Sequence, residues 1–129
     1  MKFSFTEEQD EFRSGLRRFL EDKSPSTEVR RLMATPDGWE REQWSKINNE
    51  LGLTAIAIPE AYGVHGFGVS EQCIILEEMG RSLLCAPYFG SAVLATSAIL
   101  YAGTEEQKKE LLPGIASGDT VATLAFTEE

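Results

Sequence analysis

The sequence has few of the residues that build metal sites or disulfide frameworks. Its 129 residues include two cysteines and one histidine. Cys73 and Cys85 are each followed by apolar residues, which predicts buried free thiols in a reducing compartment. His65 lies among glycines with no cysteine beside it, and one histidine cannot form a zinc site. We therefore expect no metal ligands in this sequence.

Basic residues are also scarce. There are 12 lysines and arginines against 21 aspartates and glutamates, which gives a net charge of −9. Proteins that bind nucleic acid through its phosphates show a basic patch, and none is visible along this sequence. Nucleic acid is therefore not an expected partner.

No signal or transit peptide is visible at the start of the sequence. Residues 1–5 are followed at once by the polar, acidic stretch 6–10. A secretory signal would need an apolar stretch after its basic residues. This pattern predicts a cytoplasmic protein of a bacterial cell.

The longest uncharged run, residues 82–104, is broken too early to span a membrane. Pro87 interrupts it, and Gly90 follows. The helix that remains, 88–102, has a length of roughly 22 Å at 1.5 Å per residue, whereas a bilayer core is about 30 Å thick. We expect a helix that is buried on nearly all sides and that another domain or subunit helps to cover.

Common catalytic motifs are missing. There is no Gly-x-Ser-x-Gly, His-Glu-x-x-His or Walker sequence. The glycines Gly63, Gly66 and Gly68 do not have the dinucleotide-binding spacing, so we interpret them as a sharp structural loop. Glu77 and Glu78 suggest an acid–base pair, but adjacent helical residues point about 100° apart. A solvated helix face is the favoured interpretation of this pair.

The sequence does contain helical periodicity with clear start and stop signals. Thr6 and Gln9 form a capping box, and so do Thr104 and Gln107. The predicted helices run from residue 6 to 22 or 23, and over 27–33, 40–51, 70–83, 88–102 and 104–116.

Several single residues mark the expected helix ends and the core. Ser26 or Thr27 is expected to cap the second helix and Ser70 the fourth, while Gly52 marks the end of the third. The aromatic residues expected in the core or at a domain interface are Trp39, Trp44 and Tyr62.

Two short segments have the pattern of extended chain. Residues 53–58 are apolar and end at Pro59, and residues 122–127 alternate between larger and smaller or polar side chains. A single strand has no partner to pair with, which suggests that the sequence stops inside a larger protein. The expected fold is therefore all-α, with five or six helices and one terminal β-strand.

Three segments resemble the acyl-CoA dehydrogenase family. The loop and following helix of these enzymes are similar to PEAYG (59–63) with Gly66, followed by EEMG (77–80). The family's sixth-helix segment is similar to GTEEQKKELLP (103–113) with Gly118. The start of its flavin-contacting strand resembles LAFTE (124–128). The order and spacing of the three segments fit over the whole chain.

The resemblance implies a place within a three-domain enzyme. The family fold has an N-terminal helical domain, a middle β-domain and a C-terminal four-helix domain, with FAD between the last two. Residues 1–118 would be the N-terminal domain, and 119–129 the start of the middle one. The enzymes remove a proton from the α carbon of an acyl thioester and pass a hydride from the β carbon to the flavin, in fatty-acid or in sterol and branched-acid catabolism. The catalytic base would lie beyond residue 129, so no catalytic residue is expected here.

The same resemblance implies ligands and partners. They are an acyl-CoA substrate, FAD, an electron-transfer flavoprotein as electron acceptor, and further subunits of a homo- or hetero-oligomer. FAD is expected in the full-length protein and is not expected to be held by this chain alone. The family pattern assigns flavin contacts to Leu124, Phe126 and Thr127.

In the family, the long apolar helix lines the deep end of the acyl pocket, which assigns Tyr88, Phe89, Gly90 and Leu94 to that pocket. Glycine inside a helix lowers helix stability by about 1 kcal/mol relative to alanine, so the presence of Gly90 needs an explanation. One reason is an open pocket end that accepts a branched or ring-bearing CoA thioester. The other, which we favour, is a ragged helix start or the close approach of another helix. The small residues in these turns are Gly90, Ser91, Ala92 and Ala95.

An alternative interpretation keeps the helices without the redox chemistry. The chain would then be a non-catalytic partner subunit or a stand-alone helical interaction module. The apolar helix 88–102, which needs a cover, favours membership of a larger assembly in either case.

Overall fold

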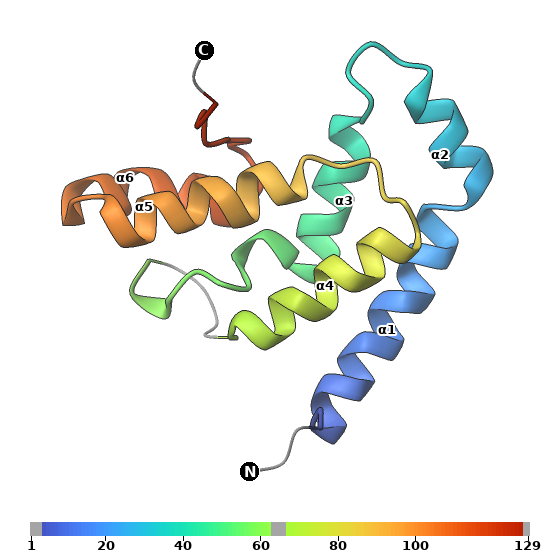
Figure 1. Ribbon diagram of the computed structural model, residues 1–129, viewed down its shortest axis with the longest axis horizontal. Coiled ribbons are helices and arrows are strands. Elements are labelled where there is room, and N and C mark those ends of the chain that lie inside the picture. Colours follow the sequence, from blue (N-terminus) through green and yellow to red (C-terminus); the bar gives the residue numbers. More distant parts are fainter. Residues whose placement is uncertain (1–3, 63–66, 128–129) are drawn as a thin grey trace.

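The computed structural model describes residues 4–62 and 67–127, and in this part the chain is helical (Figure 1). This confirms the predicted helical fold. The loop residues Gly63, His65 and Gly66, and the terminal Glu128 and Glu129, lie outside the described residues. The six α-helices of the described part are α1 (Glu7–Lys23), α2 (Ser26–Met33), α3 (Arg41–Leu51), α4 (Val69–Arg81), α5 (Thr96–Ala102) and α6 (Glu105–Ala116).

Three shorter helical segments complete the chain. Two are single 3₁₀ turns, η1 (Leu53–Ala55) and η2 (Glu60–Tyr62). The third, η3 (Phe89–Ala95), is a π-helix that leads directly into α5. Among the described residues, none of these helices has the length and apolar character needed to cross a bilayer.

Both predicted capping boxes are present. At the start of α1, the Gln9 N–H donates to Thr6 Oγ1 over 3.2 Å, and the Thr6 N–H donates to Gln9 Oε1 over 3.0 Å. At the start of α6, the corresponding distances between Gln107 and Thr104 are 3.3 and 2.9 Å. Each box satisfies two backbone groups that the helix itself leaves unpaired.

Two other predicted caps are wrong. Pro25 precedes α2, so Ser26 is already inside the helix, and no side chain caps it. Helix α4 begins at Val69, so Ser70 also lies inside its helix, while Glu71 Oε2 accepts the Gly68 N–H over 2.7 Å. The residue type permits a cap, but the cap position depends on where the backbone turns into helical geometry.

Residues 53–58 are not extended, contrary to the prediction. Gly52 ends α3 with φ of 60°, and the chain then turns through η1. Thr54 is buried, and its Oγ1 lies 2.8 Å from Asn48 Oδ1 and 2.9 Å from the Ala116 carbonyl oxygen. A short apolar run does not distinguish a strand from a buried turn, and here the turn satisfies the polar groups.

Helix α4 is shorter than predicted. It ends at Arg81, so Leu83 lies beyond the helix and does not continue its apolar face. Leu83 adopts φ of 51°, and the Leu84 N–H donates to the Met79 carbonyl oxygen over 3.0 Å. This is the Schellman closure that a left-handed residue makes possible.

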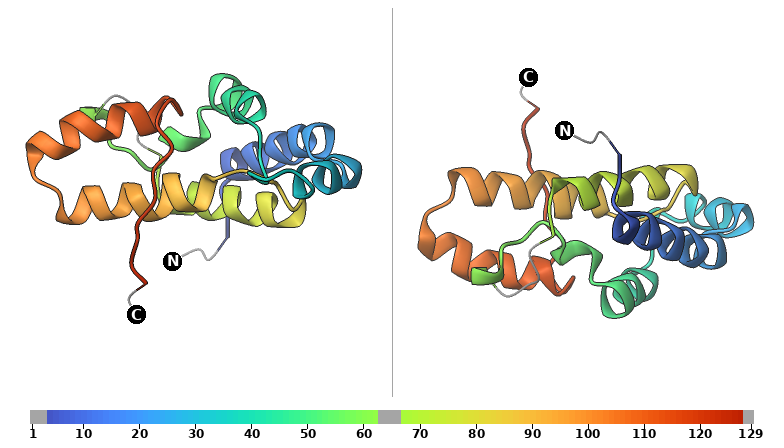
Figure 2. Two further views of the ribbon diagram at one scale, coloured as in Figure 1. Left: turned by 90° about the horizontal axis from the view of Figure 1, so that it is seen from above. Right: turned by 90° about the horizontal axis from the view of Figure 1, so that it is seen from below.

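Two apolar clusters hold the helices together. Helices α5 and α6 run antiparallel at one end of the molecule, while α1 and α4 lie side by side near the other (Figures 1 and 2). The first cluster joins α1, α3, α4 and η3 and includes Leu16, Leu20, Trp44, Ile47, Ile75 and Tyr88. The second joins η1 and the turn after it to α6 through Ala55, Ile58, Leu112, Ile115 and Ala116.

Some burial predictions fail. Cys73 is exposed on α4 and Cys85 is half-buried, so the expectation of two buried thiols is wrong. The helix expected to be buried on nearly all sides is also partly open, because Phe89 is 56% exposed and Tyr101 88% exposed. Packing within this chain covers only part of that helix.

The predicted terminal strand is not confirmed. Residues 121–127 have no regular structure and run away from the helices after crossing η3 (Figure 2). A strand needs a neighbour for its ladder hydrogen bonds, and the described residues supply none.

A buried polar contact fixes the turn before this segment. Trp44, on α3, donates its indole N–H to the Gly118 carbonyl oxygen over 2.8 Å, and the Asn48 amide donates to the Trp44 carbonyl oxygen over 2.9 Å. Gly118 has φ of 78° and packs directly against the Asn48 side chain. The turn therefore requires glycine for both its backbone and its packing.

We predict that Gly118→Ala lowers the free energy of unfolding by about 2–4 kcal/mol. A positive φ costs an alanine roughly 1–2 kcal/mol, and the new Cβ would also displace Asn48. Gly38→Ala is the matched control, because Gly38 has φ of 71° but open space around it. Urea denaturation should show a clearly larger loss at Gly118, and equal losses would contradict the packing argument.

Candidate functional site

The predicted pocket residues occupy the start of the η3–α5 helix in different environments. Tyr88 is buried, and its hydroxyl donates to the Leu53 carbonyl oxygen over 3.1 Å. This burial raises the pKa of the Tyr88 hydroxyl above its ordinary value. Phe89 is exposed and Leu94 is half-buried. The structure thus places Tyr88 in the core and leaves Phe89 accessible.

Gly90 faces residues 120–127, which we call the C-terminal segment. A Cβ at Gly90 would lie 3.4 Å from Thr123 Oγ1 and 3.8 Å from the Ala122 carbonyl oxygen. The next residue, Ser91, is buried and accepts the Ala122 N–H at its Oγ over 3.2 Å. The close approach is made by the C-terminal segment, which favours the packing interpretation of Gly90 over the open pocket end.

The three predicted flavin-contacting residues lie just beyond this crossing. Leu124 is 40% exposed and Phe126 69% exposed, and Thr127 is exposed as well. Within the described part of the chain, the backbone N–H groups of residues 124–127 have no hydrogen-bond acceptor. Accessible apolar side chains beside free backbone donors fit a ligand with an apolar ring and polar edges, as a flavin has.

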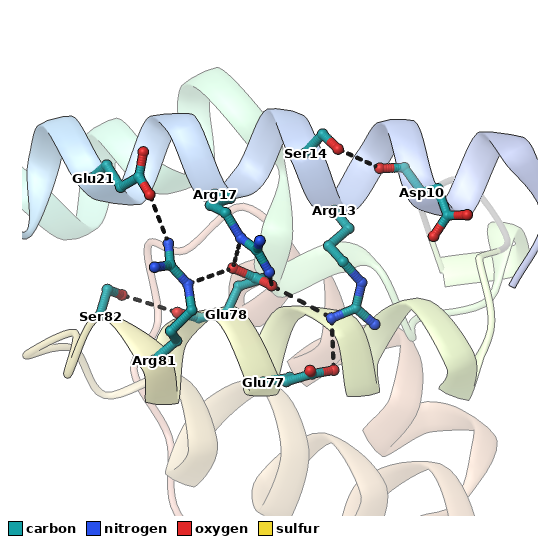
Figure 3. Close-up of polar contacts among 9 residues, drawn as sticks. All are labelled: Asp10, Arg13, Ser14, Arg17, Glu21, Glu77, Glu78, Arg81 and Ser82. Atoms are coloured by element: carbon teal, nitrogen blue, oxygen red, sulfur yellow. Dashed lines mark hydrogen bonds and ion pairs between the residues drawn. The ribbon is translucent and has the colours of Figure 1, made fainter.

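The densest polar cluster of the described residues lies elsewhere, between α1 and α4 (Figure 3). Its centre is Glu78, whose side chain is completely buried. Arg17 donates to it twice, from Nε over 2.9 Å and from Nη2 over 2.6 Å. Arg81 Nε adds a bond of 3.0 Å, and Arg13 Nη1 lies 3.4 Å away.

Two outer carboxylates complete this cluster. Arg13 also donates to Glu77 over 2.7 Å, and Arg81 donates to Glu21 over 3.1 Å. The six side chains therefore alternate in charge, with three arginines and three glutamates (Figure 3). The interpretation of Glu77 and Glu78 as a solvated face is wrong for Glu78, because its carboxylate faces α1.

The cluster is structural in its chemistry. The Arg17 hydrogen bonds, opposed by burial and aided by Arg81 and Arg13, lower the pKa of Glu78 from 4.5 to about 2. A carboxylate that stays ionised and has both oxygens engaged is not available as a general acid or base near neutral pH. The pair of glutamates therefore does not form a catalytic dyad.

The sequence did contain a signal for this buried charge. Glu78 lies three residues after Ile75, so the two share a helix face. Arg13 and Arg17 are four residues apart and likewise share a face of α1. A carboxylate on an apolar helix face, matched by two arginines on another helix, indicates a buried ion cluster.

The structure also contains a groove away from the predicted site residues. A groove of about 750 Å³ lies between the ends of α1 and α4 and the helix α2, and its walls include Val29, Met33 and Leu83. None of the predicted site residues lines it. Among the described residues, no group of three or more histidine, cysteine, aspartate or glutamate side chains is arranged to hold a metal ion.

Comparison with known proteins places the sequence in a defined group. The family profile described as "Acyl-CoA dehydrogenase, N-terminal domain" matches residues 6–119. The chain is 36% identical over 91 residues to acyl-CoA dehydrogenase FadE27 of Mycobacterium tuberculosis, covering 70% of this chain and 24% of that protein.

Solved structures agree with the sequence match. The ChsE4–ChsE5 complex from Mycobacterium tuberculosis gives a TM-score of 0.84 at 30% identity, covering 95% of this chain and 34% of the other. A variant of the Tcur3481–Tcur3483 steroid ACAD gives 0.80 at 32% identity, covering 91% and 32%. The chain spans only 24% to 38% of the length of the first curated relatives.

We predict that Glu78→Gln lowers the free energy of unfolding by about 2–3 kcal/mol. Breaking a buried ion pair typically costs roughly 3–5 kcal/mol, but here the arginine side chains are partly exposed and can regain water. Glu77→Gln is the control, because the Glu77 side chain is 64% exposed and a surface pair contributes at most about 1 kcal/mol. Similar losses for the two variants would contradict a buried centre at Glu78.

The Glu78 carboxylate should also make the free energy of unfolding depend on pH in acidic solution. Because the pKa of Glu78 falls from 4.5 to about 2 on folding, its contribution is complete above pH 4.5 and is lost as the pH drops toward 2. We expect the difference in unfolding free energy between the unsubstituted chain and Glu78→Gln to shrink across this interval. Denaturation at stepped pH measures it, and a constant difference would show that Glu78 has an ordinary pKa.

Proposed function

Because this chain belongs to the acyl-CoA dehydrogenase family as its N-terminal domain, we propose that it forms one wall of the acyl pocket in a flavin-dependent acyl-CoA dehydrogenase. The whole enzyme would dehydrogenate an acyl-CoA thioester between its α and β carbons. The observation that carries the proposal is the family match over residues 6–119. The catalytic base is expected beyond residue 129.

The C-terminal segment is the proposed contact with the cofactor. FAD, when bound, would supply the hydride-accepting chemistry. Leu124 and Phe126 offer apolar contact, because both side chains are accessible. The Thr127 hydroxyl and the free backbone N–H groups would donate hydrogen bonds to the polar edge of the ring. These few contacts are too weak to retain FAD without the other domains.

The start of the η3–α5 helix is the proposed pocket wall. Phe89 and Leu94 would contact the acyl group, since neither is fully covered by this chain. Tyr88 would support the wall from behind, held by its bond to Leu53. Gly90 would belong to the same wall, with Ala122 and Thr123 packed against it. The similarity to a steroid ACAD supports a ring-bearing or branched acyl thioester as substrate.

The exposed apolar side chains of this chain indicate where other domains or subunits would pack. The exposed Phe89, Tyr101 and Phe126 would be covered by the remaining domains or by a neighbouring subunit. An electron-transfer flavoprotein is the proposed electron acceptor. A second candidate function is that of a non-catalytic partner subunit, and the match to the ChsE4–ChsE5 complex supports membership of an assembly with more than one kind of subunit.

We predict that the whole protein containing this chain purifies with bound FAD, and that an acyl-CoA substrate bleaches the flavin absorbance under anaerobic conditions. A panel of straight-chain, branched and ring-bearing acyl-CoAs would identify the substrate class. The control is the 129-residue chain alone, which should show no stoichiometric flavin spectrum. A whole protein that neither holds FAD nor oxidises any acyl-CoA would overturn the dehydrogenase proposal and leave the non-catalytic subunit.

A further inference from the structure

The C-terminal segment crosses two helices at glycines. In α6, a Cβ at Gly114 would lie 2.6 Å from Thr120 Oγ1, and the Thr120 N–H donates to the Gly114 carbonyl oxygen over 2.9 Å. In η3, a Cβ at Gly90 would lie 3.4 Å from Thr123 Oγ1. Both glycines lie within helices, where alanine would be the stronger helix former. Close approach of the segment explains both of them.

Ser91 fastens the segment between these two crossings. Its side chain is completely buried, and Oγ accepts the Ala122 N–H over 3.2 Å. Its carbonyl oxygen accepts the Thr96 hydroxyl over 3.0 Å, within the wide turn of η3. The Ser91 backbone is therefore held in place by its own helix. In the described part of the chain, this is the one hydrogen bond from residues 121–127 to a helix.

We propose that Gly114, Gly90 and Ser91 form a seat that fixes the path of residues 120–123. The seat sets the point at which Leu124, Phe126 and Thr127 leave the helical domain. It thereby positions these residues toward the flavin, and this last step rests on the proposed function. Ser91 and the two glycines are positioning residues, because none of them needs to touch the cofactor.

The seat gives Gly90 a purpose other than an open pocket end. The space beside Gly90 is filled by Ala122 and Thr123 of the same chain. An alanine there would make ordinary contact at 3.4 Å, whereas a leucine would push the segment away. The two interpretations therefore predict different consequences for Gly90→Leu. A displaced segment weakens flavin binding for every substrate, whereas a filled pocket end discriminates by acyl size.

The first test uses the 129-residue chain and amide hydrogen exchange read by NMR. Ser91→Ala and Gly90→Leu should each raise the exchange rate of the Ala122 amide about tenfold, as loss of one net hydrogen bond implies. Gly80→Leu is the control, since a Cβ at Gly80 meets open space on α4. Melting followed by circular dichroism shows that each variant is folded. Unchanged exchange at Ala122 in folded Ser91→Ala and Gly90→Leu would overturn the seat.

The second test measures the FAD dissociation constant of the whole protein that contains this chain. Gly90→Leu should weaken FAD binding at least about tenfold without changing the relative preference for large and small acyl-CoAs. Adding Thr123→Ala, which removes the opposing Oγ1, should restore part of the affinity. Unchanged FAD binding with a shifted acyl-size preference would overturn the seat in favour of the open pocket end. If the unsubstituted protein binds no FAD, the proposed function fails, and the exchange experiment still decides the seat.

Discussion

One buried carboxylate determines how the first helix lies on the fourth. Glu78 has no contact with water, so its charge must be balanced within the protein. Arg13 and Arg17 reach it from α1, and Arg81 reaches it from α4 itself. A shift of α1 along α4 would remove Arg17 from its two short bonds and leave the buried carboxylate with fewer charged partners. The apolar contacts of Leu16, Leu20 and Ile75 form in the register that these bonds allow.

A second constraint acts where the chain leaves the helices. Trp44, Asn48 and Thr54 form one polar network that reaches the carbonyl groups of Ala116 and Gly118 at the end of α6. The network fixes the turn at Gly118, and the seat at Gly90, Ser91 and Gly114 fixes the residues that follow. The direction of the C-terminal segment is thus set by buried contacts on both sides of residue 120. The proposed cofactor contacts, Leu124, Phe126 and Thr127, depend on this direction, although they follow the buried contacts along the chain.

The two capping-box patterns were reliable, because their chemistry is local. Thr6 and Gln9 predicted the first helix, and Thr104 and Gln107 the last, because a capping box is satisfied within four residues. Gly52 predicted the end of α3 for the same reason, since only its own backbone has to adopt positive φ. The patterns failed at residues 53–58, at Leu83 and at Glu78. At residues 53–58 and at Glu78, groups distant in sequence decide the conformation or the burial, whereas at Leu83 a local positive φ closes the helix.

The sequence by itself determined the helical class, most of the helix bounds, and the resemblance to acyl-CoA dehydrogenases, which the family match confirms. It also selected Leu124, Phe126 and Thr127 as flavin contacts and Tyr88, Phe89, Gly90 and Leu94 as pocket residues, and these assignments stay predictions. Only the tertiary structure showed that Tyr88 lies in the core, that Gly90 meets Thr123, and that Glu78 holds three arginines. The physical reason is that periodicity records which face of a helix is apolar. It does not record which distant segment, charged or neutral, packs against that face.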